Sequence, residues 1–283
     1  MPKLTLGTAQ FGLHYGISNQ RGKVGKKSVK AILNYAQQIG IDTLDTAHTY
    51  GNSEYVLGPL ASSSTKIITK TLPMGDSQDT TCLDHLNHAF MRSIQLLHRN
   101  PYGLMVHHER DLLGPLGDKI DEQMRHFKAQ GLVQKIGVSV YTPEALSQIL
   151  NRYSMDMVQL PINLLDQRFV DMLPMLKQRG VEIYARSIFL QGLLLMPLKN
   201  VDTFFDPIYD HLCAIPEPRL DLCLSFVKML DLVDFIVVGI TTLEELQMIY
   251  LKFTQYPIMM DYTAYRLDEE KFINPSRWEL SSK

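Results

Sequence analysis

The feature that most constrains this chain is a regular alternation of short apolar runs with longer amphipathic segments. A run of about four or five residues that is followed by a helical pattern predicts parallel strands joined by helical crossovers. The expected strands are Lys3 to Leu6, Thr43 to Asp45, Lys66 to Lys70, Gly103 to His107, Gln134 to Val138, Met157 to Leu160, Glu182 to Ala185 and Phe235 to Val238. Eight such units are the number that closes a barrel.

Apolar residues spaced three or four positions apart predict the intervening helices. They are expected over Lys27 to Ile39, Thr80 to Leu97, Lys119 to Gln130, Val170 to Arg179, Pro218 to Leu230 and Leu243 to Phe253, with one more starting at Thr142. We therefore predict a single-domain (β/α)8 TIM barrel over residues 1–283, with 264–283 as a C-terminal extension. An open doubly wound sheet would need a G-x-G-x-x-G turn, which Gly7 to Gly12 does not provide.

Composition excludes several classes of protein. Lys plus Arg is 28 and Asp plus Glu is 30, so the net charge of −2 offers no basic face for nucleic acid. No apolar run approaches the roughly 20 residues of a membrane span, and the N-terminus lacks the pattern of an export signal. Three cysteines cannot all pair, which suits a cytoplasmic protein. His85 and His88 lack a third ligand nearby, so no metal site is expected. The sequence specifies no oligomeric state.

Ionisable residues fall where the predicted strands end, and barrel enzymes place their chemistry at the carboxyl ends of strands. Asp45 ends the second strand, Tyr50 lies in the loop after it, Lys70 ends the third strand and His107 ends the fourth. We expect these four side chains to converge. Because alternate residues of a strand face opposite sides, at most one of His107 and His108 is expected to face the site.

This set of side chains suits proton transfer. A tyrosine has an ordinary pKa of about 10, and a nearby ammonium lowers it while a carboxylate holds that ammonium in place. An imidazole can orient the carbonyl oxygen of a substrate. Nothing in the set supplies electrons, so a redox reaction would need a cofactor.

The same residues resemble the aldo-keto reductase family. The segment from Gly40 to Glu54, which contains Asp45 and Tyr50, is similar to that family's signature, and Ile67 to Lys70 and Leu104 to His107 resemble its Lys and His strands. The resemblance runs from Gly7 to about Leu246 and is closest to bacterial members. It implies NAD(P)H-dependent reduction of an aldehyde or ketone to an alcohol. Tyr50 would be the proton donor, Lys70 and Asp45 its tuning pair, and His107 the substrate-orienting residue.

The resemblance also implies a nicotinamide cofactor site. Ser139 and Gln159 match contacts to the carboxamide, although Val140 stands where the family usually has Asn. Arg186 stands where an aromatic ring or its substitute covers the nicotinamide, and the loop from Phe189 to Gly192 would hold the pyrophosphate. The implied cofactor-binding residues are Gly7, Thr8, Ser139, Gln159, Asn163, Arg186, Ser187, Phe189, Gln191, Gly192 and Gly239.

The segment after the eighth strand departs from the family. Gly239 and Glu245 align with the Lys and Arg that grip the adenosine phosphate, and Met248 and Ile249 replace the pair that binds adenine. Glu245 would repel a 2′-phosphate, and Lys252 would compensate only on a favourably oriented helix. The cofactor is therefore NADPH or NADH, with little preference expected.

Two other functions fit parts of the sequence. The altered adenine end is compatible with a weakly active or inactive barrel that acts as a nucleotide-binding regulatory subunit. A Schiff-base aldolase or isomerase would use Lys70, but only if its amine were desolvated and unpaired. The substrate is expected to be a small carbonyl compound, and Arg186, His14 and Tyr15 favour a polar, sugar-like one.

Overall fold

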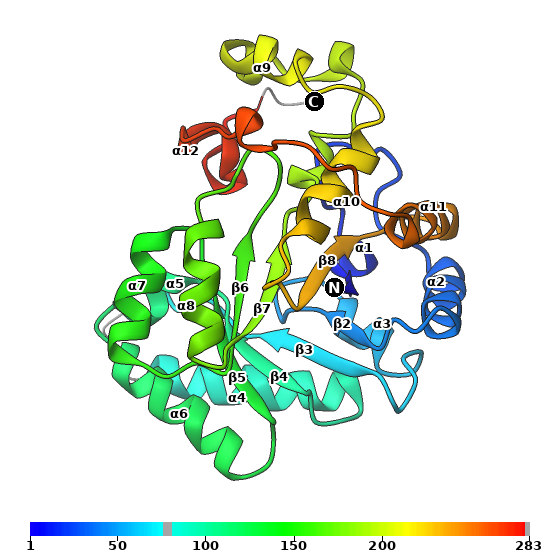
Figure 1. Ribbon diagram of the computed structural model, residues 1–283. Coiled ribbons are helices and arrows are strands. Elements are labelled where there is room, and N and C mark those ends of the chain that lie inside the picture. Colours follow the sequence, from blue (N-terminus) through cyan, green and yellow to red (C-terminus); the bar gives the residue numbers. More distant parts are fainter. Residues whose placement is uncertain (76–80, 281–283) are drawn as a thin grey trace.

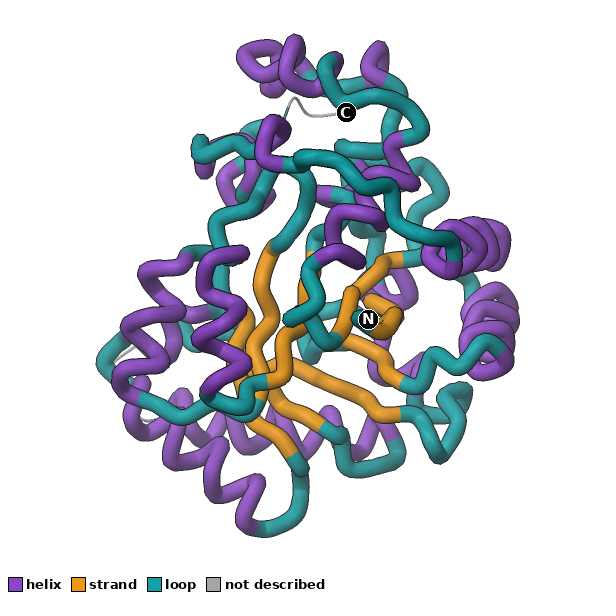
Figure 2. Tube along the Cα trace, in the orientation of Figure 1, coloured by secondary structure: helices purple, strands orange, loops and turns teal. Residues whose placement is uncertain are grey.

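The computed structural model describes residues 1–75 and 81–280, and its eight strands form one closed barrel in sequence order. All neighbouring strands are parallel, and the last closes on the first, with Lys3 opposite Phe235 and Gly7 opposite Gly239. Figure 2 shows the strands surrounded by helices. The strands are β1 (Lys3–Gly7), β2 (Thr43–Asp45), β3 (Lys66–Lys70), β4 (Gly103–Val106), β5 (Lys135–Ser139), β6 (Met157–Pro161), β7 (Glu182–Arg186) and β8 (Phe235–Gly239). The predicted (β/α)8 barrel is confirmed.

Helices connect successive strands on the outside of the barrel (Figure 1). The longer ones are α2 (Lys26–Gln38), α4 (Thr81–Leu97), α6 (Gly117–Ala129), α7 (Pro143–Arg152), α10 (Arg219–Met229) and α11 (Leu243–Thr254). The shorter ones are α1 (Ala9–Gly12), α3 (Ser53–Leu57), α5 (Glu109–Leu113), α8 (Leu173–Gln178), α9 (Tyr209–Cys213) and α12 (Glu270–Ile273). Thr80, the predicted first residue of the helix that ends at Leu97, lies outside the described residues.

Several predicted boundaries shift by one or two residues, and two larger or clearer differences have identifiable reasons. The helix expected over 170–179 is divided into a 3-10 turn, η1 (Val170–Met172), and α8, whose first turn contains Pro174. Proline has no backbone N–H and is accommodated in the first turn of a helix rather than in its interior. Strand β4 ends at Val106, because the backbone N–H of His107 donates to the Thr71 hydroxyl at 3.1 Å.

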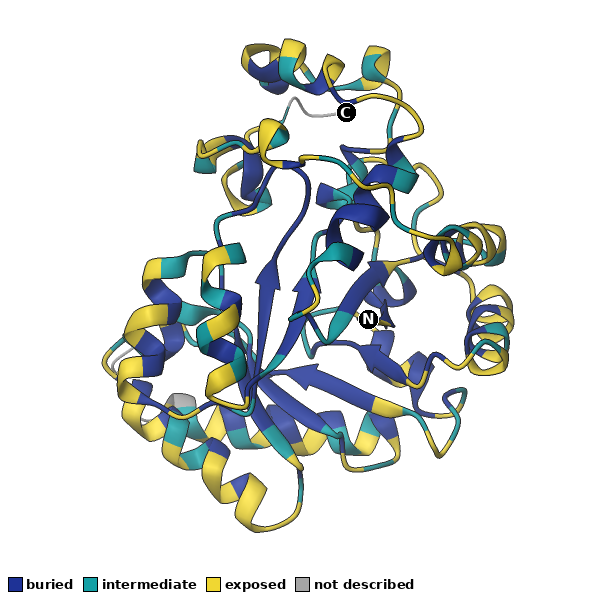
Figure 3. Cartoon of the chain, in the orientation of Figure 1, coloured by how far each residue is buried: buried dark blue, intermediate teal, exposed yellow. Residues whose placement is uncertain are grey.

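The buried faces explain why the strands and helices stack in two layers. Helix α2 buries Val29, Ile32, Leu33 and Ala36, the stripe that its sequence spacing predicts. Figure 3 shows the strands in the buried colour and the outward faces of the helices exposed. A separate buried cluster of Ile68, Met105, Met157, Tyr184 and Val237, one residue from each of five strands, is the filling expected inside such a barrel.

The C-terminal extension packs on the segment between β7 and α10. Within that segment lies the 3-10 turn η4 (Thr203–Ile208), and the Trp278 ring meets Phe205 edge-on with centroids 5.0 Å apart. The backbone N–H of Leu267 donates to the Leu165 carbonyl at 2.9 Å. Figure 1 places α12 and α9 beyond the carboxyl end of β6. None of the helices within residues 1–75 and 81–280 combines the length and apolarity of a membrane span.

Candidate active site

The carboxyl ends of the strands surround a cavity of about 790 Å³, within the range of roughly 300–1,000 Å³ typical of ligand pockets. The parallel register explains why residues far apart in sequence meet there. Gly7, Asp45, Lys70, Ser139, Arg186 and Gly239 are each the last residue of a strand, and all line the cavity. The strand-end prediction therefore located one common site.

Lys70 and Asp45 form a buried ion pair in this cavity. The Lys70 Nζ lies 2.6 Å from Asp45 Oδ1 and donates to the Thr46 carbonyl at 3.0 Å, while Gln159 Nε2 donates to the same Asp45 oxygen at 2.8 Å. Burial lowers the pKa of Lys70, and the charge and hydrogen bond of Asp45 oppose that effect. The expected pairing is present, so the Lys70 amine is desolvated but paired. A Schiff-base nucleophile would have to be desolvated and unpaired.

Tyr50 enters the cavity from the loop after β2. A Cβ on Gly12 would overlap the Tyr50 carbonyl oxygen, so a glycine there allows helix α1 and this loop to approach closely. The Lys70 Nζ lies 5.1 Å from the centroid of the Tyr50 ring. The His107 ring lies 5.9 Å away and nearly perpendicular to it, at 80°. The structure thus brings together all four residues predicted to be catalytic.

The ionisation of Tyr50 differs from the expectation. Burial raises the pKa of the phenol above its ordinary value, the negative charge of Asp45 raises it further, and the charge of Arg186 opposes them. The physical reason is that burial and a nearby carboxylate both disfavour the phenolate. The prediction that the pKa of Tyr50 is depressed is therefore wrong for this structure.

Both histidines after β4 line the cavity. Their rings stack with centroids 5.0 Å apart, and His108 stacks in turn on Tyr141 at 6.1 Å. Burial, with the charges of Lys70 and His108, lowers the pKa of His107 to about 3, so its imidazole is neutral. Its Nδ1 lies 3.2 Å from the Thr49 hydroxyl. The expectation that at most one histidine faces the site is wrong, because β4 ends at Val106 and strand alternation stops there.

Arg186 also lines the cavity. Its guanidinium donates to the Ser187 hydroxyl at 3.2 Å and to the Val140 carbonyl at 3.1 Å. The guanidinium carbon lies 4.4 Å from the centroid of the Tyr141 ring, a cation–π geometry. The cation is thus fixed beside the cavity end that holds Tyr50.

The loop after β7 has an unusual backbone. Ser187, Leu190 and Gln191 have φ angles of 57°, 47° and 53°, a left-handed region that non-glycine residues rarely adopt. Successive backbone amides around such residues can form anion-binding concavities. Asn163 supports this loop by donating to the Ser187 carbonyl at 3.1 Å. Asn163 is buried and is absent from the described cavity lining, so its expected place in the cofactor site is corrected to a supporting one.

The cavity extends to β8 and the start of α11. A Cβ on Gly239 would lie 2.6 Å from Gln10 Nε2, so the Gln10 side chain packs directly against the end of β8. Glu245 Oε2 accepts hydrogen bonds from the backbone amides of Thr241 at 2.7 Å and Thr242 at 3.3 Å, and with Thr242 it forms a capping box at the helix start. The Glu245 carboxylate is therefore already bound by the helix that carries it.

Ten of the eleven predicted cofactor residues line the cavity. They are Gly7, Thr8, Ser139, Gln159, Arg186, Ser187, Phe189, Gln191, Gly192 and Gly239. Met248 and Ile249 also line it. Lys252 instead pairs with Asp221 at 3.0 Å and is not in the described lining, so it does not compensate for Glu245. Tyr15 lines the cavity, whereas His14 lies against the Asn19 carbonyl, with its Nε2 2.6 Å away.

Several polar lining residues were not selected as site residues from the sequence, among them Gln10, Arg21, His108 and Tyr141. Tyr141 lies two residues after β5, so a wider search around strand ends would have found it. Arg21 has no comparable local signal, because it reaches the cavity through the fold of the long loop between α1 and α2.

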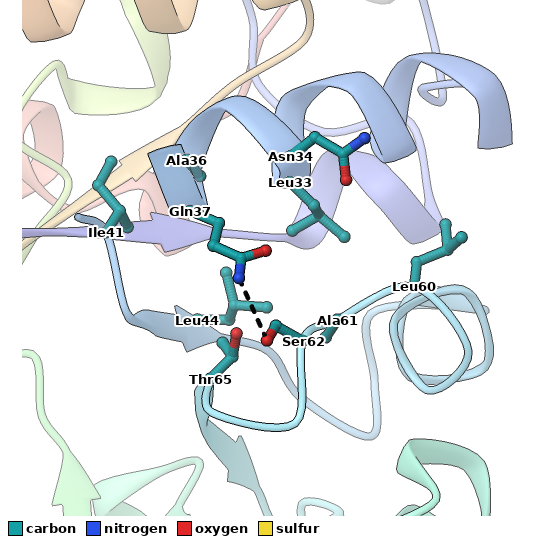
Figure 4. Close-up of a pocket in the computed structure, with 10 residues that line it drawn as sticks. All are labelled: Leu33, Asn34, Ala36, Gln37, Ile41, Leu44, Leu60, Ala61, Ser62 and Thr65. Carbon is teal, nitrogen blue, oxygen red and sulfur yellow. Dashed lines mark hydrogen bonds between the residues drawn. The ribbon is translucent and has the colours of Figure 1, made fainter. Parts of the chain in front are cut away.

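A second, smaller hollow lies between α2 and the chain before β3 (Figure 4). Its volume is about 20 Å³, room for roughly one water molecule. Gln37 Nε2 donates to the Ser62 hydroxyl across it at 3.5 Å. The hollow is too small for a substrate.

A closed parallel barrel with buried ionisable residues and a large cavity at the carboxyl ends of its strands defines this chain as a (β/α)8 barrel protein with an enzyme-like site. The sequence profile of the Aldo/keto reductase family matches residues 3–259, and the chain belongs to that family of oxidoreductases.

Individual relatives agree with this assignment. The chain is 24% identical over 208 residues to the "Uncharacterized oxidoreductase YqkF" of Bacillus subtilis (strain 168), which covers 69% of this chain and 67% of the relative. The fold of the present chain is similar to that of the holo form of the aldo-keto reductase AKR11C1 from Bacillus halodurans. The TM-score is 0.73 and the sequence identity is 18%, and the match covers 93% of this chain and 90% of that one. The fold is also similar to that of the glycerol dehydrogenase AKR11B4 from Gluconobacter oxydans. That match has a TM-score of 0.71 and 18% identity, and it covers 90% of this chain and 87% of that one.

Proposed function

We propose that this protein reduces a small aldehyde or ketone to an alcohol with NADPH or NADH, and that Tyr50 donates the proton. The observation that carries the proposal is the convergence of Tyr50, His107 and the buried Lys70–Asp45 pair at one end of the large cavity. Its remaining length, with the left-handed loop after β7, fits an elongated dinucleotide. When bound, the nicotinamide cofactor supplies the hydride.

Tyr50 and His107 face the oxygen of the substrate carbonyl. The raised pKa of Tyr50 keeps its phenol protonated at neutral pH, so it can donate a proton to that oxygen as the carbonyl carbon accepts the hydride. His107 is neutral and its Nδ1 lies 3.2 Å from the Thr49 hydroxyl; with its proton on Nε2, the imidazole would donate a second hydrogen bond to the same oxygen. The C=O double bond is thereby reduced to an alcohol, and the phenolate left on Tyr50 lies near two cations, Lys70 and Arg186.

The cavity wall supports a polar substrate. Tyr15, His108, Tyr141 and Arg186 present hydroxyl, imidazole and guanidinium groups close to Tyr50, which suits a hydroxylated, sugar-like carbonyl compound. The pairing of Lys70 with Asp45 argues against a Schiff-base mechanism. The odd number of cysteines supports a cytoplasmic setting for this activity.

The Tyr50→Phe variant tests the proposal, because it keeps the ring and removes the proton donor. Carbonyl reduction should fall by about 10²–10⁴-fold, the usual contribution of general acid catalysis, while the Kd for NADPH stays unchanged. The measurement is NADPH oxidation with a panel of aldehydes and hydroxylated ketones, with calorimetric titration of the cofactor. A parent protein that binds cofactor and reduces no carbonyl compound would instead favour the regulatory-subunit alternative.

A further inference from the structure

One cationic side chain lines the end of the cavity formed by β8 and α11. In the described residues, the Lys and Arg side chains that line the cavity are Arg21, Lys70 and Arg186. Lys70 is paired with Asp45, and Arg186 is fixed against Tyr141. Arg21 comes from the loop between α1 and α2, and α2 packs against α11. Gln20, Thr241, Glu245 and Met248 line the same cavity.

The turn that carries Arg21 is held in place by Asn19. The Asn19 side-chain oxygen accepts from the backbone amides of Arg21 at 2.9 Å and Gly22 at 3.1 Å, and its amide donates to the carbonyls of Tyr15 at 3.2 Å and Gly22 at 3.0 Å. The backbone N–H of Val24, which is buried, donates to the Gln10 carbonyl at 2.8 Å. The loop therefore presents Arg21 from a fixed backbone.

The charge of Arg21 is available to a ligand. None of the ion pairs found across residues 1–75 and 81–280 includes it. Its charge nevertheless reaches the start of α11. The pKa of Glu244 lies below its ordinary value because the carboxylate accepts hydrogen bonds from the Glu244 backbone amide and from Thr242. The charge of Arg21 lowers that pKa further. The carboxylate of Glu245 is meanwhile occupied by the amides and hydroxyl of Thr241 and Thr242.

We propose that Arg21 is a specificity-determining residue that binds the 2′-phosphate of the adenosine ribose, so that the protein prefers NADPH to NADH. The inference rests on the proposed function, since it presumes a nicotinamide dinucleotide in the cavity. A phosphate monoester carries about −1.5 to −2 charges near pH 7, and a guanidinium can bind it through two parallel hydrogen bonds. NADH has only a hydroxyl at this position. Arg21 thereby supplies the positive charge that Gly239 and Glu245 do not provide.

The experiment compares four ligands on the full-length protein by calorimetric titration: NADPH, NADH, 2′,5′-ADP and 5′-AMP. The last two probe the adenosine end without the nicotinamide. Arg21→Gln should weaken NADPH and 2′,5′-ADP about 10- to 100-fold, as expected for loss of hydrogen bonds to a charged group. It should leave NADH and 5′-AMP within about twofold, as for a surface substitution. Lys23→Gln, an exposed position two residues away that is absent from the described lining, is the matched control.

Several results would overturn the proposal. An Arg21→Gln protein that binds NADPH and 2′,5′-ADP as tightly as the parent, while the parent reduces carbonyl compounds, removes Arg21 and leaves the proposed function intact. An equal loss for all four ligands would show that Arg21 holds the loop rather than the phosphate. A loss of NADPH affinity in Lys23→Gln as large as that in Arg21→Gln would reduce the effect to general charge. A parent that binds neither NADPH nor NADH would reject the inference together with the proposed function.

Discussion

Burial, more than residue type, sets the ionisation of the residues around Tyr50. It raises the pKa of Tyr50 and lowers the pKa of His107 to about 3, so the phenol is protonated and the imidazole neutral across the ordinary range of pH. Neither group needs to change its charge before substrate binds. Under the proposed function, both groups are then in the protonation state that lets them donate hydrogen bonds to one carbonyl oxygen.

This arrangement predicts a flat pH dependence. The kcat/KM for carbonyl reduction should vary little between about pH 5 and 9, because that quantity reports ionisations of the free enzyme and neither group titrates there. Initial rates in buffers of constant ionic strength provide the test. A limb near pH 6.5 that disappears in His107→Asn would show that His107 titrates and that its burial has been overstated.

The Lys70–Asp45 pair gives a second prediction at this scale. Lys70→Met leaves the Asp45 carboxylate buried without its cation, and breaking such a pair typically costs about 3–5 kcal/mol of unfolding free energy. The double variant Lys70→Met/Asp45→Asn removes the orphaned charge and should recover most of that loss without recovering activity. Urea unfolding and turnover are measured on the same preparations. Equal stability of the single and double variants would contradict a buried, charged Asp45.

At the scale of elements, Glu245 belongs to α11 more than to the cavity. Its carboxylate and the Thr242 hydroxyl form a reciprocal capping box, a role that Gln can also fill. The sequence alone indicates only that Glu245 would repel a phosphate. An Arg at this position would add a positive charge but would also remove the cap.

Substitutions at Glu245 should separate these two roles. Glu245→Ala should lower the free energy of unfolding by about 0.5–2 kcal/mol, the range measured for lost helix caps, whereas Glu245→Gln should lower it by much less. Glu245→Gln should also tighten NADPH modestly, because it removes a negative charge from the cavity wall. Denaturant unfolding and calorimetry check the two effects. Equal destabilisation by Ala and Gln would mean that the cap contributes little to stability.

At the scale of the molecule, the C-terminal extension supports the site from behind. The described residues of 264–283 are absent from the cavity lining, but the extension packs on the segment that supplies Leu195, Met196, Pro197 and Asn200 to it. Phe272 and Ile273 of α12 are buried in the main core. We therefore expect the extension and the barrel to form one cooperative unit, as the single-domain prediction requires.

Trp278 is the single tryptophan of the chain and reports on this contact. Urea unfolding followed by tryptophan fluorescence should coincide with unfolding followed by far-UV circular dichroism, the mark of a two-state transition. A fluorescence transition at lower urea would show that the extension detaches first and is a separate unit. Titration with NADPH should shift both curves together, because ligand binding stabilises the folded state as a whole.

The sequence alone is sufficient to predict the barrel and most of the residues that lie around Lys70 and Asp45 in the candidate active site. Strand and helix periodicity follow from local spacing, and parallel strands bring their carboxyl ends to one side. Asp45, Lys70, Arg186 and Gly239 could therefore be placed together before any distance was known. The expected extension and the loop after β7 were also located by order along the chain.

Which charges lie together and which loops fold back on the cavity depends on the tertiary structure. Burial and the Asp45 carboxylate raise the pKa of Tyr50, and Glu245, which its sequence position would make repulsive to a phosphate, caps helix α11. Arg21 reaches α11 through a turn fixed by Asn19. These outcomes depend on distances between residues remote in sequence and on their burial, neither of which local periodicity encodes.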